Sequence, residues 1–311
     1  MSLENSLIEL AYSIRLAVRP MLGLEASRRS AGKASSGDES FQIDRVAEQV
    51  VSDFISKHKL PVAYYSEDRG LVEHGRSKYV LVIDPIDGTR PAMAGFEQCV
   101  VSIALAPYRP NACLDDVSFA CILELKQDRL ITAAKGGKVT IREGRSTSTP
   151  CLSTNTDLRS MAWTYEIAGR PSELVTRALA PLIDLSSLCG GVFIVNSIAY
   201  SMTRLITGQL SACVDVGNRI VRDYPSTRDQ FIKAGLGSVI GLFPYDIAGA
   251  VLVAEAAGCV VTDAYGKPLG GTRLLDTSED SIQSCVAASN PVLHGLILEA
   301  IEAGMNALST A

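Results

Sequence analysis

Two aspartates stand three positions apart in the hexapeptide Asp-Pro-Ile-Asp-Gly-Thr at 84–89, directly after a short apolar run at 79–83. The run has the length and β-branched content of a buried strand, so we expect both carboxylates at the carboxyl end of that strand. Open sheets place their ligands at this edge. Gly88 permits a tight turn there, and Thr89 adds a hydroxyl beside newly freed N–H groups. The hexapeptide could therefore hold a divalent cation and a phosphate together.

A second interpretation of the same residues is structural. An Asp-Gly dipeptide most often closes a β-hairpin. Pro85 counts against a simple hairpin, and so does the additional acid at Asp84. We therefore favour the ligand site.

Two further acids stand at the ends of predicted elements, Glu67 after a short strand and Asp246 at the start of a helix. Four acids could converge only if something cancels their repulsion, because like charges about 4 Å apart interact by several kcal/mol near a protein surface. Divalent cations would cancel it, and a ligand set made only of oxygens suits Mg²⁺. Asp246 could also be a helix N-cap, although a carboxylate has enough oxygens for both roles.

Composition excludes several classes of protein. The chain has 311 residues, of which 47% are hydrophobic and 20% are charged, as in a globular protein with a large core. Its net charge of −5 argues against nucleic acid and anionic membranes as partners. The most apolar stretch, 191–210, contains Asn196, Arg204 and Gln209, so it predicts a buried helix rather than a membrane span.

Cysteine usage and the first residues indicate a compartment. The eight cysteines are scattered singly, without a C-x-x-C pair, which is typical of thiols in a reducing cytoplasm and makes a zinc site improbable. The first ten residues include Glu4 and Glu9 and lack the basic start of a signal peptide. We expect a cytoplasmic protein.

The elements that must position the acids follow from periodicity. In the first half we expect helices at 3–19 and 41–58, a helical turn after Thr89, and strands at 62–65, 79–83, 100–106, 117–125, 129–135 and 138–142. In the second half we expect strands at 160–166, 212–216, 259–263 and 285–288, helices at 171–183, 192–207, 246–257 and from 290 onward, and an irregular stretch at 217–243. The fold class is α/β mixed with antiparallel strands.

A stretch rich in Ser and Thr at 144–157 marks a domain boundary. We expect an N-terminal α+β domain at 1–150 that carries Glu67, Asp84 and Asp87. A C-terminal α/β domain at 151–311 would carry Asp246.

The motifs together resemble the inositol monophosphatase family, which includes the archaeal-type fructose-1,6-bisphosphatases and other lithium-sensitive phosphatases. They are the hexapeptide at 84–89, Ser-Glu-Asp at 66–68, Tyr-Asp-Ile-Ala-Gly-Ala at 245–250 and Glu-Ala-Ala-Gly at 255–258. Their order and spacing match from Asp44 to the Ala-Ser-Asn-Pro segment at 288–291. The resemblance implies a layered α-β-α-β-α sandwich of the sugar phosphatase type, assembled as a homodimer.

The resemblance also implies roles for individual residues. Two or three Mg²⁺ ions would be held by Glu67, Asp84, the Ile86 carbonyl, Asp87 and Asp246, with Asp84 bridging. Gly88 and Thr89 would offer N–H groups to the phosphate of a small-molecule ester. Thr89, with Asp44, would orient the attacking water, and Glu67 would join them as a catalytic residue. Hydrolysis would then be direct attack by a metal-activated water on an inositol monophosphate or fructose 1,6-bisphosphate class of substrate.

The residues that would choose the substrate are harder to find. Asp215 falls where relatives place an acid that bonds substrate hydroxyls, and Asp87 and Asp246 would also face the substrate. Arg219 and Arg222 follow the same strand and could meet a second phosphate, or they could be solvated surface charges. Two departures from the family pattern are Arg90 after Thr89 and an insertion at 223–243, which could be a lid or a dimer contact.

Other functions compete with this one. A haloacid-dehalogenase-type phosphatase also places acids and Gly-Thr after a strand, but it spaces its acids two apart and forms an aspartyl-phosphate. A 3′-phosphoadenosine-type nucleotide phosphatase would use the same metal site. A non-catalytic, regulatory sugar-phosphate-binding protein would keep the site without turnover.

Overall fold

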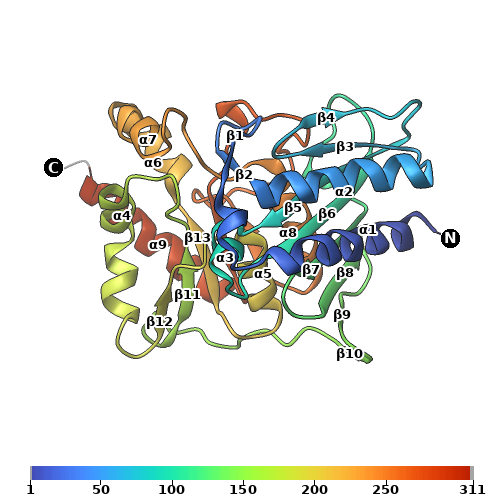
Figure 1. Ribbon diagram of the computed structural model, residues 1–311. Coiled ribbons are helices and arrows are strands. Elements are labelled where there is room, and N and C mark those ends of the chain that lie inside the picture. The colour runs from blue at the N-terminus through green and yellow to red at the C-terminus, as the bar shows by residue number, and fades with distance from the viewer. Residues whose placement is uncertain (1, 309–311) are drawn as a thin grey trace.

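The computed structural model describes residues 2–308. In that range the strands form a two-stranded hairpin, a larger sheet of eight strands and a smaller sheet of five strands. Figure 1 shows the larger sheet beside α1 and α2, and the smaller sheet beside α4 and α9. No helix within 2–308 combines the length and the apolar character needed to cross a bilayer.

The larger sheet comes from the first half of the chain. Its strands, in spatial order, are β10 (Ser146–Ser148), β9 (Thr140–Glu143), β8 (Arg129–Ala134), β7 (Phe119–Glu124), β6 (Val100–Pro107), β5 (Tyr79–Asp87), β3 (Val62–Ser66) and β4 (Gly70–Val72). The pairing is antiparallel except between β3 and β5. Because β3 and β5 are parallel, their carboxyl ends meet at one edge, where Glu67 follows β3 and the acids of 84–87 end β5.

The continuous apolar run of β5 reflects burial on both faces of the sheet. Val80, Leu81, Val82 and Ile83 are each at most 1% exposed. The register with β6 then shifts between Asp84 and Asp87, as in a β-bulge, and Pro85 lies inside this irregularity. A bulge re-aims the side chains that follow it, so this one changes the direction of Asp87 relative to Asp84.

The smaller sheet comes from the second half of the chain. Its strands, in spatial order, are β12 (Gly191–Phe193), β11 (Ala162–Tyr165), β13 (Ala212–Asp215), β15 (Cys285–Ala288) and β14 (Val260–Thr262). The pairings of β11 are parallel and those of β15 are antiparallel.

Helices make the other three layers. Those on the larger sheet are α1 (Leu3–Val18) and α2 (Gln42–His58), those between the sheets are α5 (Ile198–Ile206) and α8 (Pro244–Ala256), and those on the smaller sheet are α4 (Ser172–Ser186) and α9 (Pro291–Leu308). α8 is apolar on nearly every side, as a helix between two sheets has to be. Gly249 lets it lie close to β6, since a Cβ there would be 2.9 Å from Ser102 Oγ. The expected α-β-α-β-α sandwich is confirmed.

Two expectations from the second half were wrong in detail. The helix expected at 192–207 begins only after Ser197, which caps α5, because the preceding residues pair with β11 as the strand β12. The stretch 217–243, expected to be irregular, contains α6 (Gly217–Asp223) and α7 (Arg228–Ala234). Pro225 separates these two short helices.

The remaining elements surround the edge where the acids lie. They are the hairpin of β1 (Ser30–Lys33) and β2 (Glu39–Phe41), and the short helix α3 (Thr89–Ala94) after the hexapeptide. The predicted boundary at 144–157 falls between the two sheets, but one hydrophobic core joins side chains of both halves, among them Ile122, Trp163 and Val251. Whether 1–150 and 151–311 are separate domains stays a prediction. All eight cysteines are free thiols.

Candidate active site

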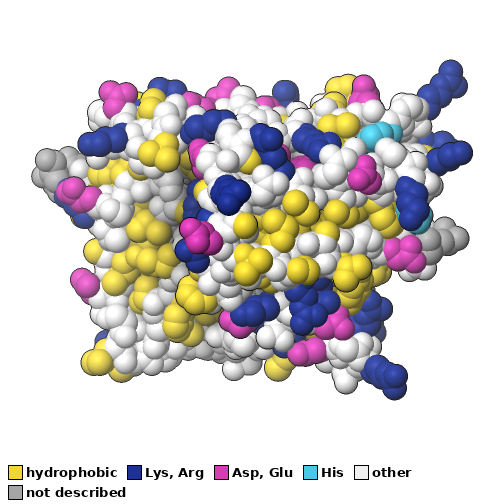
Figure 2. Space-filling model, in the orientation of Figure 1, with side chains coloured by type: hydrophobic (Ala, Val, Ile, Leu, Met, Phe, Trp, Pro, Cys, Tyr) yellow, Lys and Arg dark blue, Asp and Glu magenta, His cyan; other side chains and the backbone are white. Residues whose placement is uncertain are grey.

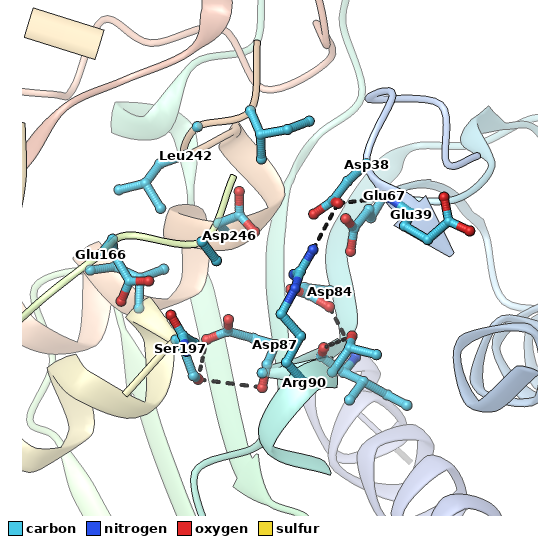
Figure 3. A pocket seen from close by; sticks show the side chains of 18 of the residues that line it. Asp38, Glu39, Glu67, Asp84, Asp87, Arg90, Glu166, Ser197, Leu242 and Asp246 are labelled. Atoms are coloured by element: carbon cyan, nitrogen blue, oxygen red, sulfur yellow. Dashed lines mark hydrogen bonds and ion pairs between the residues drawn. The ribbon is translucent and has the colours of Figure 1, made fainter. Parts of the chain in front are cut away.

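The end of β5 supplies two buried carboxylates. Asp84 is 3% exposed and Asp87 is 7% exposed. The backbone N–H of Ile86 donates to Asp84 Oδ1 at 2.9 Å, which fixes that carboxylate against its own strand. Both side chains line one cavity, shown in Figure 3.

The start of α8 brings a third carboxylate to the same cavity. The N–H of Phe243 donates to Asp246 Oδ2 at 2.6 Å in a capping box, and Pro244 occupies the first turn, where its missing N–H costs nothing. Asp246 is therefore the third residue of the helix rather than its N-cap. One oxygen each from Asp84, Asp87 and Asp246 lies within 4.8 Å of the other two.

Glu67 joins this group from the end of β3. It lines the same cavity, and Figure 3 shows its side chain near Asp38 across from Asp246. Burial raises its pKa well above 4.5, and the charge of Asp84 raises it further. The four acids singled out in the sequence thus line one cavity. Carboxylate oxygens within 4.8 Å of one another come only from the three aspartates among the described residues.

The electrostatics of the cluster call for a cation. Burial, followed by the neighbouring aspartates, raises the pKa of Asp84 well above its ordinary value. Burial and the charge of Glu67 do the same to the pKa of Asp246. Burial raises the pKa of Asp87 to about 6, although hydrogen bonds from Ser197 and the α5 backbone oppose this. Several carboxylates cannot all ionise in such a space unless positive charge joins them.

The residues present fit a hard divalent cation. The donors are carboxylate oxygens, they lie within 4.8 Å of one another, and each aspartate keeps only one oxygen on a backbone N–H. Mg²⁺ prefers such oxygen ligands. The Ile86 carbonyl, expected from the resemblance to be a ligand, lies 3.1 Å from Thr89 Oγ1 and borders the cavity.

Thr89, the first residue of α3, contacts Asp44 in the first turn of α2. Thr89 Oγ1 is 3.0 Å from Asp44 Oδ1, and its proton can go to this oxygen or to the Ile86 carbonyl. Burial raises the pKa of Asp44 to about 7. Gly88 precedes Thr89 with φ at +91°, a conformation that glycine adopts readily. A side chain at this position would collide with Ser197 and with the backbone of residues 98–99.

The start of α5 was missed as part of the site. Ser197 Oγ donates to Asp87 Oδ2 at 2.7 Å, and the Ala199 N–H donates to the same oxygen at 2.6 Å. Asp87 therefore anchors the first turn of a helix 110 residues further along the chain. A Ser before an apolar helical run is an N-cap signal, so the sequence could have placed this helix start, but not its contact with Asp87.

Glu166 and Arg170 were also missed, and both line the cavity. They follow β11, and Glu166 is 5% exposed. Burial raises the pKa of Glu166 to about 8 against the opposing charge of Arg170. Neither residue belongs to a motif, so the sequence contained no signal beyond their place after a strand.

The expected substrate residues Asp215, Arg219 and Arg222 are held elsewhere. Asp215 is 1% exposed and forms a buried ion pair with Arg170. Arg219 donates to the Ala264 carbonyl at 2.8 Å and pairs with Asp223 and Glu302. Arg222 Nη2 is 3.4 Å from the Asp280 carbonyl. Among the described residues, the cavity lining does not include these three.

Arg90 and the inserted segment border the cavity. Arg90 Nη2 pairs with Asp38 Oδ1 at 2.9 Å, which ties α3 to the β1–β2 hairpin. The hairpin also meets the insertion, since Lys33 Nζ donates to the Leu236 carbonyl at 3.2 Å. Ile240 and Leu242 from the end of the insertion line the cavity. The predicted insertion therefore forms part of the cavity wall.

Comparisons with known proteins identify the family of the chain. A model of the inositol monophosphatase family matches residues 2–306. A fructose-1,6-bisphosphatase/inositol-1-monophosphatase of Methanothermobacter thermautotrophicus is 25% identical over 303 residues, which are 95% of each chain. A bifunctional NADP phosphatase/NAD kinase of Methanococcus maripaludis is 24% identical over 94% of this chain and 48% of its own.

Solved structures show the same fold. A protein from Pyrococcus horikoshii, described as having similarities to inositol-1 monophosphatase, superposes with a TM-score of 0.69 at 22% identity. The match covers 95% of this chain and 96% of that one. The layered fold and these relatives define a phosphatase, a hydrolase of phosphoric monoesters. More particularly, this chain belongs to the inositol monophosphatase family.

Proposed function

We propose that the protein is a Mg²⁺-dependent phosphatase that hydrolyses the phosphate ester of a small polyol or sugar. The observation that carries this proposal is the cluster of three aspartate oxygens within 4.8 Å. Asp84, Asp87 and Asp246, together with Glu67 and the Ile86 carbonyl, would hold two or three metal ions. When bound, these ions would lower the pKa of the attacking water and neutralise the phosphate charge.

The chain's own residues would do the rest. Gly88 and Thr89 would offer backbone N–H groups to the phosphate. Thr89 Oγ1, which is 3.0 Å from Asp44 Oδ1, would orient the attacking water. With its pKa raised to about 7, Asp44 is able to exchange a proton near neutral pH. No nucleophilic side chain is required.

The test is phosphate release from a panel of esters, with Mg²⁺ or with a chelator. The panel contains myo-inositol 1-phosphate, fructose 1,6-bisphosphate, 3′-phosphoadenosine 5′-phosphate, NADP and phenyl phosphate. We expect Mg²⁺-dependent release that is fastest from a polyol or sugar ester. Asp84→Asn is expected to lower the rate by about 100-fold or more, because it removes a charged metal ligand. Release from no ester at all would favour a non-catalytic binding protein.

The mechanism has its own test. A haloacid-dehalogenase-type reaction would leave a phosphorylated aspartate, which can be trapped by rapid acid quenching. We expect no trapped phosphate, since water attacks directly in the proposed reaction. A stoichiometric phospho-aspartate would contradict the proposal.

A nucleotide phosphatase is the second candidate. It is favoured by one relative, whose name includes NADP phosphatase and which is 24% identical over 94% of this chain. Ile240, Leu242 and the Arg90–Asp38 pair border the cavity in which a nucleoside would have to fit. Faster release from NADP or 3′-phosphoadenosine 5′-phosphate than from any polyol ester would establish this second candidate instead.

We also propose that the protein is a cytoplasmic homodimer. Exposed apolar side chains gather at the edge strand β12 and the end of α4: Leu185, Leu188, Phe193 and Ile194 are between 40% and 92% exposed. Figure 2 shows hydrophobic side chains on the part of the surface around α4 and β12, at the left. Sedimentation equilibrium checks the assembly, and Leu188→Asp is expected to shift it toward monomer.

A further inference from the structure

We infer that Glu166 and Asn196 form a wall that binds hydroxyl groups on the alcohol part of the substrate. This inference rests on the proposed function and deepens it, because it names the residues that would select a polyol. Both residues line the cavity that contains the three aspartates. They come from different elements, Glu166 from the end of β11 and Asn196 from the turn before α5.

The first observation is that both side chains carry an acceptor without a partner. Glu166 Oε1 and Asn196 Oδ1 are buried and make no hydrogen bond with any of residues 2–308. A buried acceptor left in this state destabilises the fold, because it has lost its hydrogen bonds to water. Because both residues border the cavity, a donor for them can come from a molecule inside it. Hydroxyl groups are such donors, whereas phosphate oxygens are not.

The second observation is that the neighbouring arginine is already occupied. Arg170 gives its Nε to Asp215 Oδ1 at 3.2 Å, its Nη2 to Asp215 Oδ2, and its Nη1 to the Ala168 carbonyl at 2.6 Å. The positive charge of Arg170 therefore favours the ionised form of Glu166, but Arg170 makes no hydrogen bond to Glu166 Oε1. The same pair occupies both oxygens of Asp215, whose role as a substrate residue stays a prediction.

The third observation is the position of Glu166 and Asn196 relative to the acid cluster. In Figure 3 Glu166 lies on the side of Asp246 and Ser197, opposite Asp38 and Glu39. Asn196 directly precedes Ser197, whose hydroxyl holds Asp87 at 2.7 Å. Glu166 and Asn196 therefore border the space that the alcohol part of an ester held at the acid cluster can occupy. Ile240 and Leu242 in the same lining give the carbon skeleton apolar surface.

The experiment compares two esters with the same reacting group. One is the polyol or sugar phosphate that the wild type hydrolyses or binds best, and the other is phenyl phosphate, whose leaving group has no further hydroxyl. The variants are Glu166→Ala, Glu166→Gln and Asn196→Gly. Glycine suits position 196 because its φ is +54°. The readout is the ratio of kcat/KM for the two esters.

We expect Glu166→Ala and Asn196→Gly each to lower this ratio by about 10-fold or more, since a site built to bond a hydroxyl loses its preference when the acceptor is removed. Glu166→Gln keeps one acceptor oxygen and is expected to restore part of the ratio. A loss that is equal for both esters would overturn the inference and assign Glu166 to structure alone.

The matched control is Glu124→Gln. Glu124 is another buried glutamate, 2% exposed, that pairs with Arg204 and has one oxygen without a partner among the described residues. It does not line the cavity in the described part of the chain, so its substitution is expected to lower Tm without changing the ratio. A change in ratio as large as that of Glu166→Ala would overturn the inference.

Calorimetric binding of the same two esters separates this inference from the proposed function. If the wild type releases no phosphate but binds the polyol ester, and Glu166→Ala and Asn196→Gly weaken that binding by about 10-fold, the hydroxyl wall stands and the proposed hydrolysis fails. If phosphate is released but neither variant alters the preference in rate or binding, the wall fails and the hydrolysis stands.

Discussion

At the scale of single residues, each aspartate of the cluster divides its two oxygens between the backbone and the cavity. Asp84 accepts from Ile86, Asp87 from Ala199, and Asp246 from Phe243. These N–H groups fix the direction of each carboxylate in the absence of a metal ion. The carboxylates therefore lose less conformational entropy when an ion binds. The same bonds oppose the rise in pKa that burial causes.

The Thr89 hydroxyl gives a prediction at this scale. Thr89→Val keeps the shape of the side chain but removes the group that lies 3.0 Å from Asp44 Oδ1. If Thr89 orients the attacking water, kcat should fall by about 100-fold or more while KM changes little. Steady-state kinetics on the best ester of the panel gives both parameters, and a thermal melt shows whether the fold survives.

The control for Thr89 is its conservative variant. Thr89→Ser retains the hydroxyl and is expected to recover most of the lost kcat. If Thr89→Val works at a nearly normal rate, or if Thr89→Ser is as slow as Thr89→Val, the hydroxyl does not have the role proposed for it.

At the scale of elements, the hexapeptide shows what the sequence could and could not supply. The strand before Asp84, the turn at Gly88 and the acids of β3 and α8 follow from periodicity and from local signals, and the structure has them. The contact of Asp87 with the first turn of α5 does not, because residues 87 and 197 are joined only by the packing of two layers. Glu166 follows a strand like many other acids, and only its place in the cavity distinguishes it.

Gly88 gives a prediction at the element scale. A Cβ there would come closer to the Gln98 carbonyl oxygen than real Cβ atoms come to other atoms, and it would be 3.0 Å from the Cβ of Ser197. Gly88→Ala should therefore force the turn after β5 away from the 98–99 backbone and from Ser197, and it should cost more than about 3 kcal/mol of unfolding free energy. Urea denaturation measures that cost, and the rate of phosphate release is expected to fall with it.

Gly136 is the matched control for Gly88. It also has a positive φ, +71°, but a Cβ there would meet nothing within 4 Å. Gly136→Ala should cost only the strain of the backbone, about 1–2 kcal/mol. Equal losses in the two variants would mean that the backbone conformation, rather than the close contact with Gln98 and Ser197, decides the effect at Gly88.

At the scale of the whole molecule, the candidate active site lies where the two halves of the chain meet. Residues 1–150 supply Glu67, Asp84 and Asp87, while the second half supplies Asp246 and the start of α5. The layered fold could be expected from the order of strands and helices. The relative placement of the two sheets depends on α8, which is apolar on nearly every side and so shows no single core-facing stripe in its sequence. The shape of the cavity therefore could not be read from the sequence.

The pH dependence of unfolding tests the cluster as a property of the whole molecule. Without metal, burial raises the pKa of Asp87 from 3.8 to about 6, and the pKa values of Asp84, Asp246 and Glu67 well above their ordinary range. Between about pH 4 and the raised pKa values the folded chain then holds more protons than the unfolded chain, so the free energy of unfolding falls as pH rises through this range. Tm in a chelator should fall by about 5 °C or more between pH 5 and pH 8.

Mg²⁺ should reverse this loss, because it binds the ionised carboxylates and is excluded by their protons. The rise in Tm on adding Mg²⁺ is therefore expected to be small at pH 5 and large at pH 8. Asp84→Asn removes one of the buried charges, so its metal-free Tm should depend less on pH, and Mg²⁺ should raise it less. A wild-type Tm that gains equally from Mg²⁺ at both pH values would show that the ion binds somewhere other than these carboxylates. The same scan on Glu124→Gln, which leaves the cluster intact, should keep the wild-type dependence on both pH and Mg²⁺.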